Sequence, residues 1–119
     1  TDPDNAFFAI VVRDGDKHVG NIKLGPINRM HRTADIGLVI GEKSYWGRGI
    51  ATEAIQLVAD YGFGPLNLHK LTAGCYSNNP GSARAFEKAG FSREGLRREQ
   101  YQSAGQYVDA ILIGKVRPK

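Results

Sequence analysis

A glycine-rich bend between a strand-like run and a helical pattern constrains this chain more than any other feature. The apolar run 36–40 precedes the bend, and a helical pattern of apolar residues occupies 50–63. Gly47 and Gly49 free the backbone where the helix is expected to begin. Main-chain N–H groups can converge there on one anion, and the helix dipole adds positive potential. The bend therefore predicts either a main-chain cradle for a diphosphate or a glycine-rich turn without a ligand.

Two familiar phosphate-binding loops do not match the bend. A Walker-type loop ends in Gly-Lys-Ser/Thr, whereas Gly49 is followed by Ile50 and Ala51. A dinucleotide-binding fingerprint requires a third glycine, and Thr52 and Glu53 occupy that region instead. Both alternatives are therefore disfavoured.

A second patterned segment, 78–91, predicts a short capped helix followed by a strand. It reads Asn-Asn-Pro-Gly-Ser-Ala-Arg-Ala-Phe-Glu-Lys-Ala-Gly-Phe. Asn79 is a favourable N-cap residue, Pro80 suits the first helical position, and Gly90 suits the position just after the helix.

Together, the two segments resemble motifs A and B of the GNAT superfamily, the acyl-CoA-dependent N-acetyltransferases. The usual pattern is Arg/Gln-x-x-Gly-x-Gly/Ala, followed by Asn-x-x-Ser/Ala-x-x-x-Tyr/Phe-x-Lys-x-Gly-Phe. The match runs from about Asp35 to Phe91, and it departs from the pattern at Trp46, which replaces the usual Arg or Gln. More narrowly, the segments 45–54 and 93–97 resemble the branch that contains the ribosomal-protein N-terminal acetyltransferases.

The periodicity and the turn residues predict an α+β fold of a single domain, 1–119, with elements in the order βββαβαββ. A polar loop is expected at 25–33. On the first helix, an apolar stripe is predicted to face the core: Ile50, Ala54, Leu57, Val58 and Tyr61. The other expected elements are strands at 7–13, 18–24, 34–40, 69–76, 91–100 and 106–116 and helices at 49–63 and 79–89.

The resemblance implies a mixed, mostly antiparallel sheet with helices on both faces and two central strands that splay apart. Family members usually carry a further strand and two helices ahead of this segment. Because the chain opens at Thr1, we expect it to lack that N-terminal portion. If no such portion is missing, part of the wall of the substrate site would come from a second copy of the chain, which makes a homodimer a candidate assembly.

The composition restricts the partners and the compartment. A net charge of +4 indicates mild affinity for anions, which a phosphorylated ligand explains without invoking nucleic acid. No apolar stretch approaches the ~20 residues that span a bilayer. The single cysteine, Cys75, excludes an internal disulfide and fits a reducing cytosol, so a cytoplasmic protein is expected. The three histidines show no metal-ligand spacing, and no metal is expected.

The resemblance implies that acetyl-CoA binds between the third strand and the strand after the first helix. Backbone groups of that third strand would pair with the pantetheine amides like an added strand, through Leu38, Val39 and Ile40. Main-chain amides of the bend would hold the diphosphate: Gly47, Arg48, Gly49, Ile50, Ala51 and Thr52. Asn79 and Ser82 would face the thiol end of the carrier, and Asn79 would contact the pantetheine arm while capping its helix.

Acetyl transfer to an amine requires a base, because an alkyl ammonium has a pKa near ~10. Asp35 falls at the strand position where many superfamily members carry a glutamate base, and it would act through a water. Its alternative is a structural role as a strand-end Asp bonded to neighbouring backbone. Glu42, just before the bend, is a second candidate base.

The acid that protonates the departing thiolate is less defined by the sequence. The tyrosine that often serves in the superfamily corresponds to Phe86 here, which has no proton to give. Ser82 is the first candidate to replace it, since a serine at this helix position has that role in the ribosomal branch. Tyr76 is the second candidate. Cys75 is expected to be a buried strand residue, because direct transfer in a ternary complex needs no acyl-enzyme.

The leading hypothesis is an N-acetyltransferase that moves an acetyl group from acetyl-CoA to a protein N-terminus or a small amine. The net basic charge and scattered acidic residues favour peptide N-termini or weakly charged amines. One alternative is a catalytically degenerate acyl-CoA-binding module, which the absence of a hydroxyl at Phe86 would fit. Another is a structural partner domain that binds no CoA.

Overall fold

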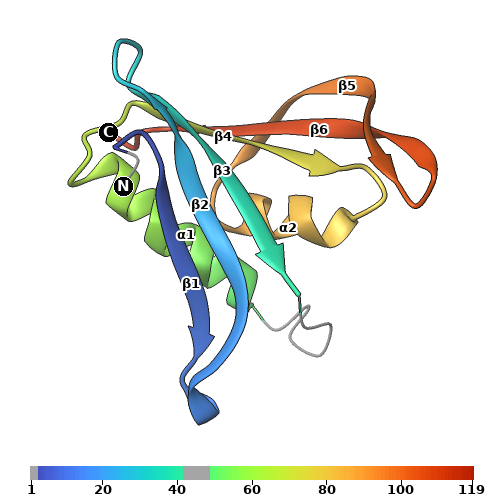
Figure 1. Ribbon diagram of the computed structural model, residues 1–119. Coiled ribbons are helices and arrows are strands. Elements are labelled where there is room, and N and C mark those ends of the chain that lie inside the picture. The colour runs from blue at the N-terminus through green and yellow to red at the C-terminus, as the bar shows by residue number, and fades with distance from the viewer. Residues whose placement is uncertain (1–2, 42–48) are drawn as a thin grey trace.

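The computed structural model describes residues 3–41 and 49–119 of the chain. A short 3-10 turn, η1 (Asp14–Asp16), joins the first two strands, and Gly15 within it has a φ of 79°. The predicted order βββαβαββ is confirmed. The strands and helices are β1 (Ala6–Val12), β2 (Lys17–Asn28), β3 (Thr33–Ile40), α1 (Ile50–Phe63), β4 (Lys70–Tyr76), α2 (Pro80–Lys88), β5 (Ser92–Ser103) and β6 (Gln106–Val116) (Figure 1).

The six strands form one sheet in the order β1-β2-β3-β4-β6-β5. Among neighbouring strands, β3 and β4 run parallel and the other pairs are antiparallel. The prediction of a mixed, mostly antiparallel sheet is therefore confirmed. β5 also runs parallel to β4, because β6 lies between them and is antiparallel to both.

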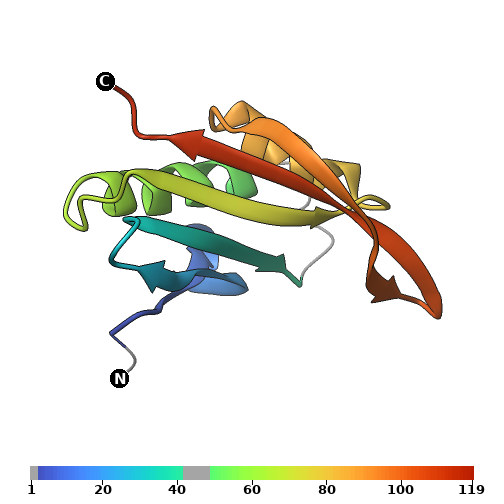
Figure 2. The same cartoon turned by 90° about the horizontal axis from the view of Figure 1, so that it is seen from above.

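Both helices cover the same face of this sheet, which we call the helix face, and we call the opposite side the open face (Figure 2). Along β4 the residues Leu71, Ala73 and Cys75 are buried, whereas the alternate residues Gly74 and Tyr76 are exposed. The crossovers through α1 and α2 step across the sheet in one direction, and right-handed crossovers of one direction place their helices on one side. The expectation of helices on both faces is therefore not met by the described residues.

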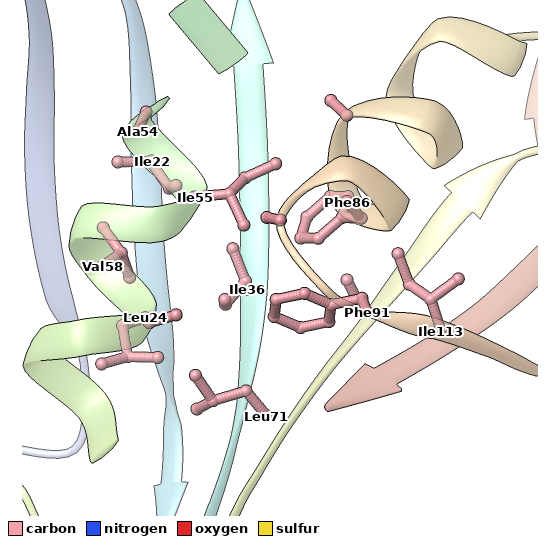
Figure 3. Packing of buried hydrophobic residues seen from close by; sticks show 14 of the residues in the cluster. Ile22, Leu24, Ile36, Ala54, Ile55, Val58, Leu71, Phe86, Phe91 and Ile113 are labelled. Carbon is pink, nitrogen blue, oxygen red and sulfur yellow. The ribbon is translucent and has the colours of Figure 1, made fainter. Parts of the chain in front are cut away.

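The core lies between the two helices and the helix face of the sheet. Its largest fully buried side chains come from both layers: Phe86, Leu24, Ile55, Leu71 and Ile113 (Figure 3). Phe86 of α2 meets Phe91 edge to face, with ring centroids 5.2 Å apart. The predicted cap of α2 is confirmed at its C-terminal end, because Gly90 has a φ of 95° and Phe91 donates its N–H to the Phe86 carbonyl at 3.0 Å.

The buried stripe of α1 differs from the predicted one. Leu57 is 64% exposed, and Tyr61 lies partly exposed with its ring edge against Phe8 of β1. Gly62 lies on the buried side, where a Cβ would come within 3.3 Å of the Leu71 side chain. At this close approach of helix and sheet, the buried stripe of α1 includes the small residues Ala59 and Gly62. The residues that α1 buries are Ala54, Ile55, Val58, Ala59, Gly62 and Phe63.

β2 continues past the point where Gly25 and Pro26 predicted a loop. The pairing with β3 shifts register between Leu24 and Ile27 and then resumes. Gly25 takes a φ of 142°, which allows the chain to make this irregularity. The prediction of a loop at 25–33 is therefore wrong for its first half, since β2 ends at Asn28.

Candidate functional site

The two parallel strands at the centre of the sheet pair over only a short stretch. β3 and β4 are in register at Thr33 and Lys70 and last meet at Asp35 and Thr72. Beyond that pair, β3 keeps its pairing with β2 and β4 keeps its pairing with β6. The strands diverge visibly from this point (Figure 1). The predicted splay of the central strands is confirmed, and Leu38 and Val39 lie on its β3 side.

A cleft of about 410 Å³ lies on the helix face beside the splay. One wall comes from β3, one from the start of α1 and one from α2. Arg84 and Lys88 bring two positive charges to the α2 wall. The lining residues are Leu38, Ile40, Gly49, Ala51, Thr52, Asn79, Gly81, Ser82, Arg84, Ala85 and Lys88.

The first turn of α1 opens into this cleft. Gly49 is the N-cap, with a φ of 79°, and no side chain caps the helix within the described residues. Its carbonyl accepts the first helical hydrogen bond, from the Glu53 N–H at 3.0 Å. The N–H groups of residues 50–52 therefore have no carbonyl partner within the helix, and the helix dipole adds positive potential beside them. Gly47, Arg48, Trp46 and Glu42, which the sequence analysis also singled out, lie outside the described residues.

The start of α2 forms the opposite wall. Asn79 is the N-cap as predicted, but its side chain makes no capping hydrogen bond within the described residues. The Ser82 N–H donates instead to the Asn79 main-chain carbonyl at 3.2 Å, which occupies a donor that the side chain would have capped. The Ser82 hydroxyl donates to the Cys75 sulfur at 3.6 Å. The expected capping bond of Asn79 is thus absent from the described structure, and its side chain borders the cleft.

Asp35 lies on the open face at the last paired position of β3. Its carboxylate accepts a hydrogen bond from the Thr72 hydroxyl at 2.8 Å. Partial burial raises the pKa of Asp35 above its usual value, while the Thr72 hydrogen bond and the charge of Lys23 oppose that rise. A base with a raised pKa at the mouth of the splay is suited to proton transfer. The Thr72 bond also fits a structural role, and both roles remain compatible with the geometry.

Two tyrosines stack on the open face beyond Asp35. Tyr76, at the end of β4, lies nearly parallel to Tyr101 of β5, with ring centroids 4.5 Å apart and an interplanar angle of 14°. Burial raises the pKa of Tyr101 first, and the neighbouring Asp35, Tyr76 and Cys75 raise it further. Tyr101 therefore holds its proton at neutral pH, close to the carboxylate of Asp35.

The sheet separates the predicted catalytic residues. Asp35 and Tyr76 project from the open face, whereas Ser82 contacts Cys75 on the helix face. Cys75 is buried, and this burial raises the pKa of its thiol above the usual value, which makes it a poor nucleophile. A substrate that contacts all of these groups must therefore extend through the gap between β3 and β4.

Sequence reasoning missed three side chains of this region. Arg84 and Lys88 are spaced i, i+4 from one another on α2, and continuing that spacing from Pro80 would have found them. Tyr101 carries no comparable signal, because its position depends on how the β5–β6 hairpin bends.

The described residues contain no group of three His, Cys, Asp or Glu side chains that could hold a metal ion. None of the helices in the described part of the chain is long and apolar enough to cross a bilayer.

Comparison with known proteins gives a match over most of the chain. The family model of the acetyltransferase (GNAT) domain matches residues 1–92. A probable N-acetyltransferase of Bacillus subtilis, YjcK, is 38% identical over 112 residues, which are 93% of this chain and 61% of the relative. The spermidine N(1)-acetyltransferase of Escherichia coli K12 is 39% identical over 104 residues, which are 87% of this chain and 55% of the relative. The chain thus spans little more than half the length of these relatives.

The fold also matches a solved structure. Spermidine N-acetyltransferase from Vibrio cholerae in complex with CoA and spermine has a TM-score of 0.86 to this chain at 28% identity. The match covers 97% of this chain and 67% of that one. Another structure of the Vibrio cholerae protein is dodecameric.

Proposed function

Because this chain belongs to the acetyltransferase (GNAT) domain family, we propose that it forms the domain of an N-acetyltransferase that moves an acetyl group from acetyl-CoA to a primary amine. One observation carries the proposal: β3 and β4 part beyond Asp35 and Thr72 directly beside a cleft that the start of α1 enters. An elongated carrier with a diphosphate at one end and a thioester at the other fits that arrangement.

The residues of the cleft fit acetyl-CoA in size and in charge. A volume of about 410 Å³ is within the range of small-molecule sites. We propose that the N–H groups of Ile50, Ala51 and Thr52 bind the diphosphate together with Gly49, where a side chain would fill the approach. The proposed contacts of Gly47 and Arg48 fall outside the described residues.

The rest of the carrier would run along β3 towards the splay. Leu38 and Val39 offer their backbone on the side that β4 has left, and Ile40 lines the cleft. Asn79 and Ser82 border the path from α2, and the exposed carboxamide of Asn79 is available to the pantetheine arm. Arg84 and Lys88 add positive charge along the same wall, which favours a carrier with several phosphates.

When bound, acetyl-CoA supplies an acetyl thioester, and the amine attacks its carbonyl directly in a ternary complex. The Asp35 carboxylate takes a proton from the incoming ammonium through a water. The Thr72 hydroxyl orients that carboxylate. The raised pKa of Asp35 makes the carboxylate a better base near neutral pH. Ser82 and Tyr76 remain candidate acids, one on each face of the sheet.

The acceptor that the relatives favour is a small amine. Relatives from Escherichia coli and Vibrio cholerae are named as spermidine N-acetyltransferases, and the Vibrio cholerae protein was solved with spermine. The Asp35 carboxylate at the splay supplies a negative charge for such a cation. A protein N-terminus is the second candidate, because the segments 45–54 and 93–97 resemble the ribosomal-protein N-terminal acetyltransferase branch.

Self-association is part of the proposal, since one relative is dodecameric. Analytical ultracentrifugation separates a homodimer, the candidate assembly from the sequence, from a dodecamer. We also treat residues 1–119 as one domain, because one cluster of buried residues joins both helices to the sheet.

The test begins with thermal stabilisation by acetyl-CoA, followed by a panel of amines with detection of the released thiol. Ligand linkage predicts about 1.4 kcal/mol of stabilisation at a tenfold excess over the dissociation constant. Gly49→Trp should abolish this response, because the side chain fills the mouth of the cleft.

A matched control is Gly105→Trp. Gly105 has the same φ of 79° with equally open space around it, but it lies in the β5–β6 turn and does not line the cleft. Both substitutions strain the backbone alike, so only Gly49→Trp should lose the response to acetyl-CoA. Equal responses in the two variants would count against the cradle. Binding without transfer to any amine of the panel would favour the degenerate acyl-CoA-binding module instead.

A further inference from the structure

A bulge in β5 brings Tyr101 back over the sheet. The pairing of β5 with β6 shifts register between Arg97 and Tyr101, where Glu99 takes a φ of 50°. The bulge is held by a hydrogen bond from the Glu99 N–H to the Asp109 carboxylate at 2.9 Å. Such bulges re-aim the side chains that follow them. Here the ring of Tyr101 lies flat on that of Tyr76.

The hydroxyl of Tyr101 reaches a position that only a glycine leaves open. A Cβ built on Gly74 would lie 2.5 Å from the Tyr101 hydroxyl oxygen but 3.7 Å from the ring carbon that carries it. Gly74 is two residues past Thr72, the last residue of β4 that pairs with β3. The hydroxyl therefore lies on the open face at the mouth of the splay, on the same side as Asp35.

This hydroxyl has no hydrogen-bond partner among the described residues. Asp35, across the splay, and Cys75, on the same strand as Gly74, both lie close enough to raise the pKa of Tyr101 further after burial, whereas Arg97 opposes them. The phenol is consequently neutral at physiological pH and has a proton to donate. The Ser82 hydroxyl, which lines the cleft, already donates to the Cys75 sulfur on the helix face.

We propose that the Tyr101 hydroxyl, held over Gly74, is the hydrogen-bond donor to the thiol sulfur of the acyl carrier and gives that sulfur its proton. Tyr101 would replace the tyrosine that often donates this proton in the superfamily and that corresponds to Phe86 here. The inference rests on the proposed function. As the C–N bond forms and the C–S bond breaks, sulfur leaves with the bonding pair and takes the phenolic proton. The amine proton passes through water to Asp35, and water returns a proton to the phenolate.

The first test needs no turnover. The thiol pKa of bound CoA is measured from thiolate absorbance in the wild-type chain and in Tyr101→Phe. A donor hydrogen bond to a thiolate favours the charged form, so Tyr101→Phe should raise the pKa of the bound thiol by about one unit. Phenylalanine keeps the stack on Tyr76, and only the hydroxyl is lost.

The matched control is Tyr107→Phe. Tyr107 belongs to the same hairpin and is 64% exposed, and the pKa of the bound thiol should not change when its hydroxyl is removed. Tyr76→Phe tests the stacked neighbour, which the proposed function keeps as a candidate acid. A change in Tyr76→Phe that equals the one in Tyr101→Phe would overturn the assignment to Tyr101.

The second test uses the fit over Gly74. Gly74→Ala should displace the hydroxyl and slow transfer in the wild-type background by about tenfold or more. In the Tyr101→Phe background the same substitution meets only the ring carbon, at 3.7 Å, and should cause no further loss. The loss in Tyr101→Phe should also shrink with an acetyl thioester of a more acidic thiol, such as thiophenol, because that thiolate leaves without a proton.

The outcomes separate this inference from the proposed function. If CoA binds and the bound thiol titrates alike in wild type and in Tyr101→Phe, the role of Tyr101 is overturned and the acetyltransferase proposal is untouched. Additive losses from Gly74→Ala and Tyr101→Phe would overturn the geometry on which the role depends. If CoA does not bind to the wild-type chain, the proposed function fails, and the role of Tyr101 fails with it.

Discussion

The two faces of the sheet hold different kinds of chemistry. On the helix face, the cleft is built largely from main chain, from small residues and from the ends of two helices, above a core that includes Phe86. On the open face, side chains with titratable groups gather at the splay: Asp35, Tyr76 and Tyr101. The proposed function thus places the binding of the carrier and the reaction with the acceptor on opposite sides of one sheet, and the gap between β3 and β4 connects the two sides.

Because of this division, substitutions on the two faces should change different properties of the protein. A residue of the helix face supports the cleft through packing, so its loss lowers stability first. A residue of the open face contributes little to packing, so its loss should lower the rate and leave the fold intact. The following predictions test that difference.

The largest effect is expected from Phe86→Ala. Phe86 is 2% exposed and packs edge to face on Phe91, so its removal should lower the free energy of unfolding by about 3–5 kcal/mol. Phe7→Ala is the matched control, because Phe7 is 72% exposed on the open face of β1. It should lower the free energy of unfolding by less than about 1 kcal/mol. Urea denaturation measures both, and equal losses would mean that the open face is packed in solution.

The next effect concerns the rate. Asp35→Asn should slow transfer by about a hundredfold, which corresponds to about 2.7 kcal/mol in the barrier. A base acts when it is deprotonated, so the wild-type rate should rise with pH through the pKa of Asp35, which burial raises above its usual value. The asparagine variant should lack this low-pH limb of the rate profile.

In Asp35→Asn, the stability of the fold should not decrease together with the rate. The pKa of Asp35 is raised in the folded state, so at neutral pH its charged form is less favoured there than in the unfolded chain. Replacing it with asparagine removes that penalty, and the free energy of unfolding at pH 7 should not fall. Thr72→Val removes the hydrogen bond that lowers the pKa of Asp35, so the low-pH limb should move to higher pH. A low-pH limb retained in Asp35→Asn would assign the base to another residue.

The helix face was the more predictable part of the molecule, because its signals are local. Gly49 and Gly90 mark helix ends through their positive φ angles, and the predicted strand 106–116 has the bounds observed for β6. Both helices begin and end within one residue of their predicted bounds. Capping and turn chemistry depend on neighbours in the sequence, so they can be read without the fold.

The misses arise where distant segments decide the structure. Leu57 was predicted to face the core. The close approach of Gly62 to Leu71 instead orients α1 so that the Leu57 side chain is exposed. Tyr101 was not predicted to be near the site, because its position depends on a bulge in β5 and on a glycine in β4. Such contacts join residues far apart in sequence, and no periodicity within either segment encodes them.

The smallest effect is expected from the charges along α2. Arg84→Gln and Lys88→Gln should each weaken CoA binding by about two- to fivefold, because exposed charge pairs contribute up to about 1 kcal/mol. The loss should shrink at high salt, where exposed charges are screened. Arg98→Gln is the control, since Arg98 is also exposed but lies on β5 and does not line the cleft. Titration of CoA at two salt concentrations measures all three variants. An equal loss in Arg98→Gln would mean that net charge, and not the wall of the cleft on the helix face, attracts the carrier.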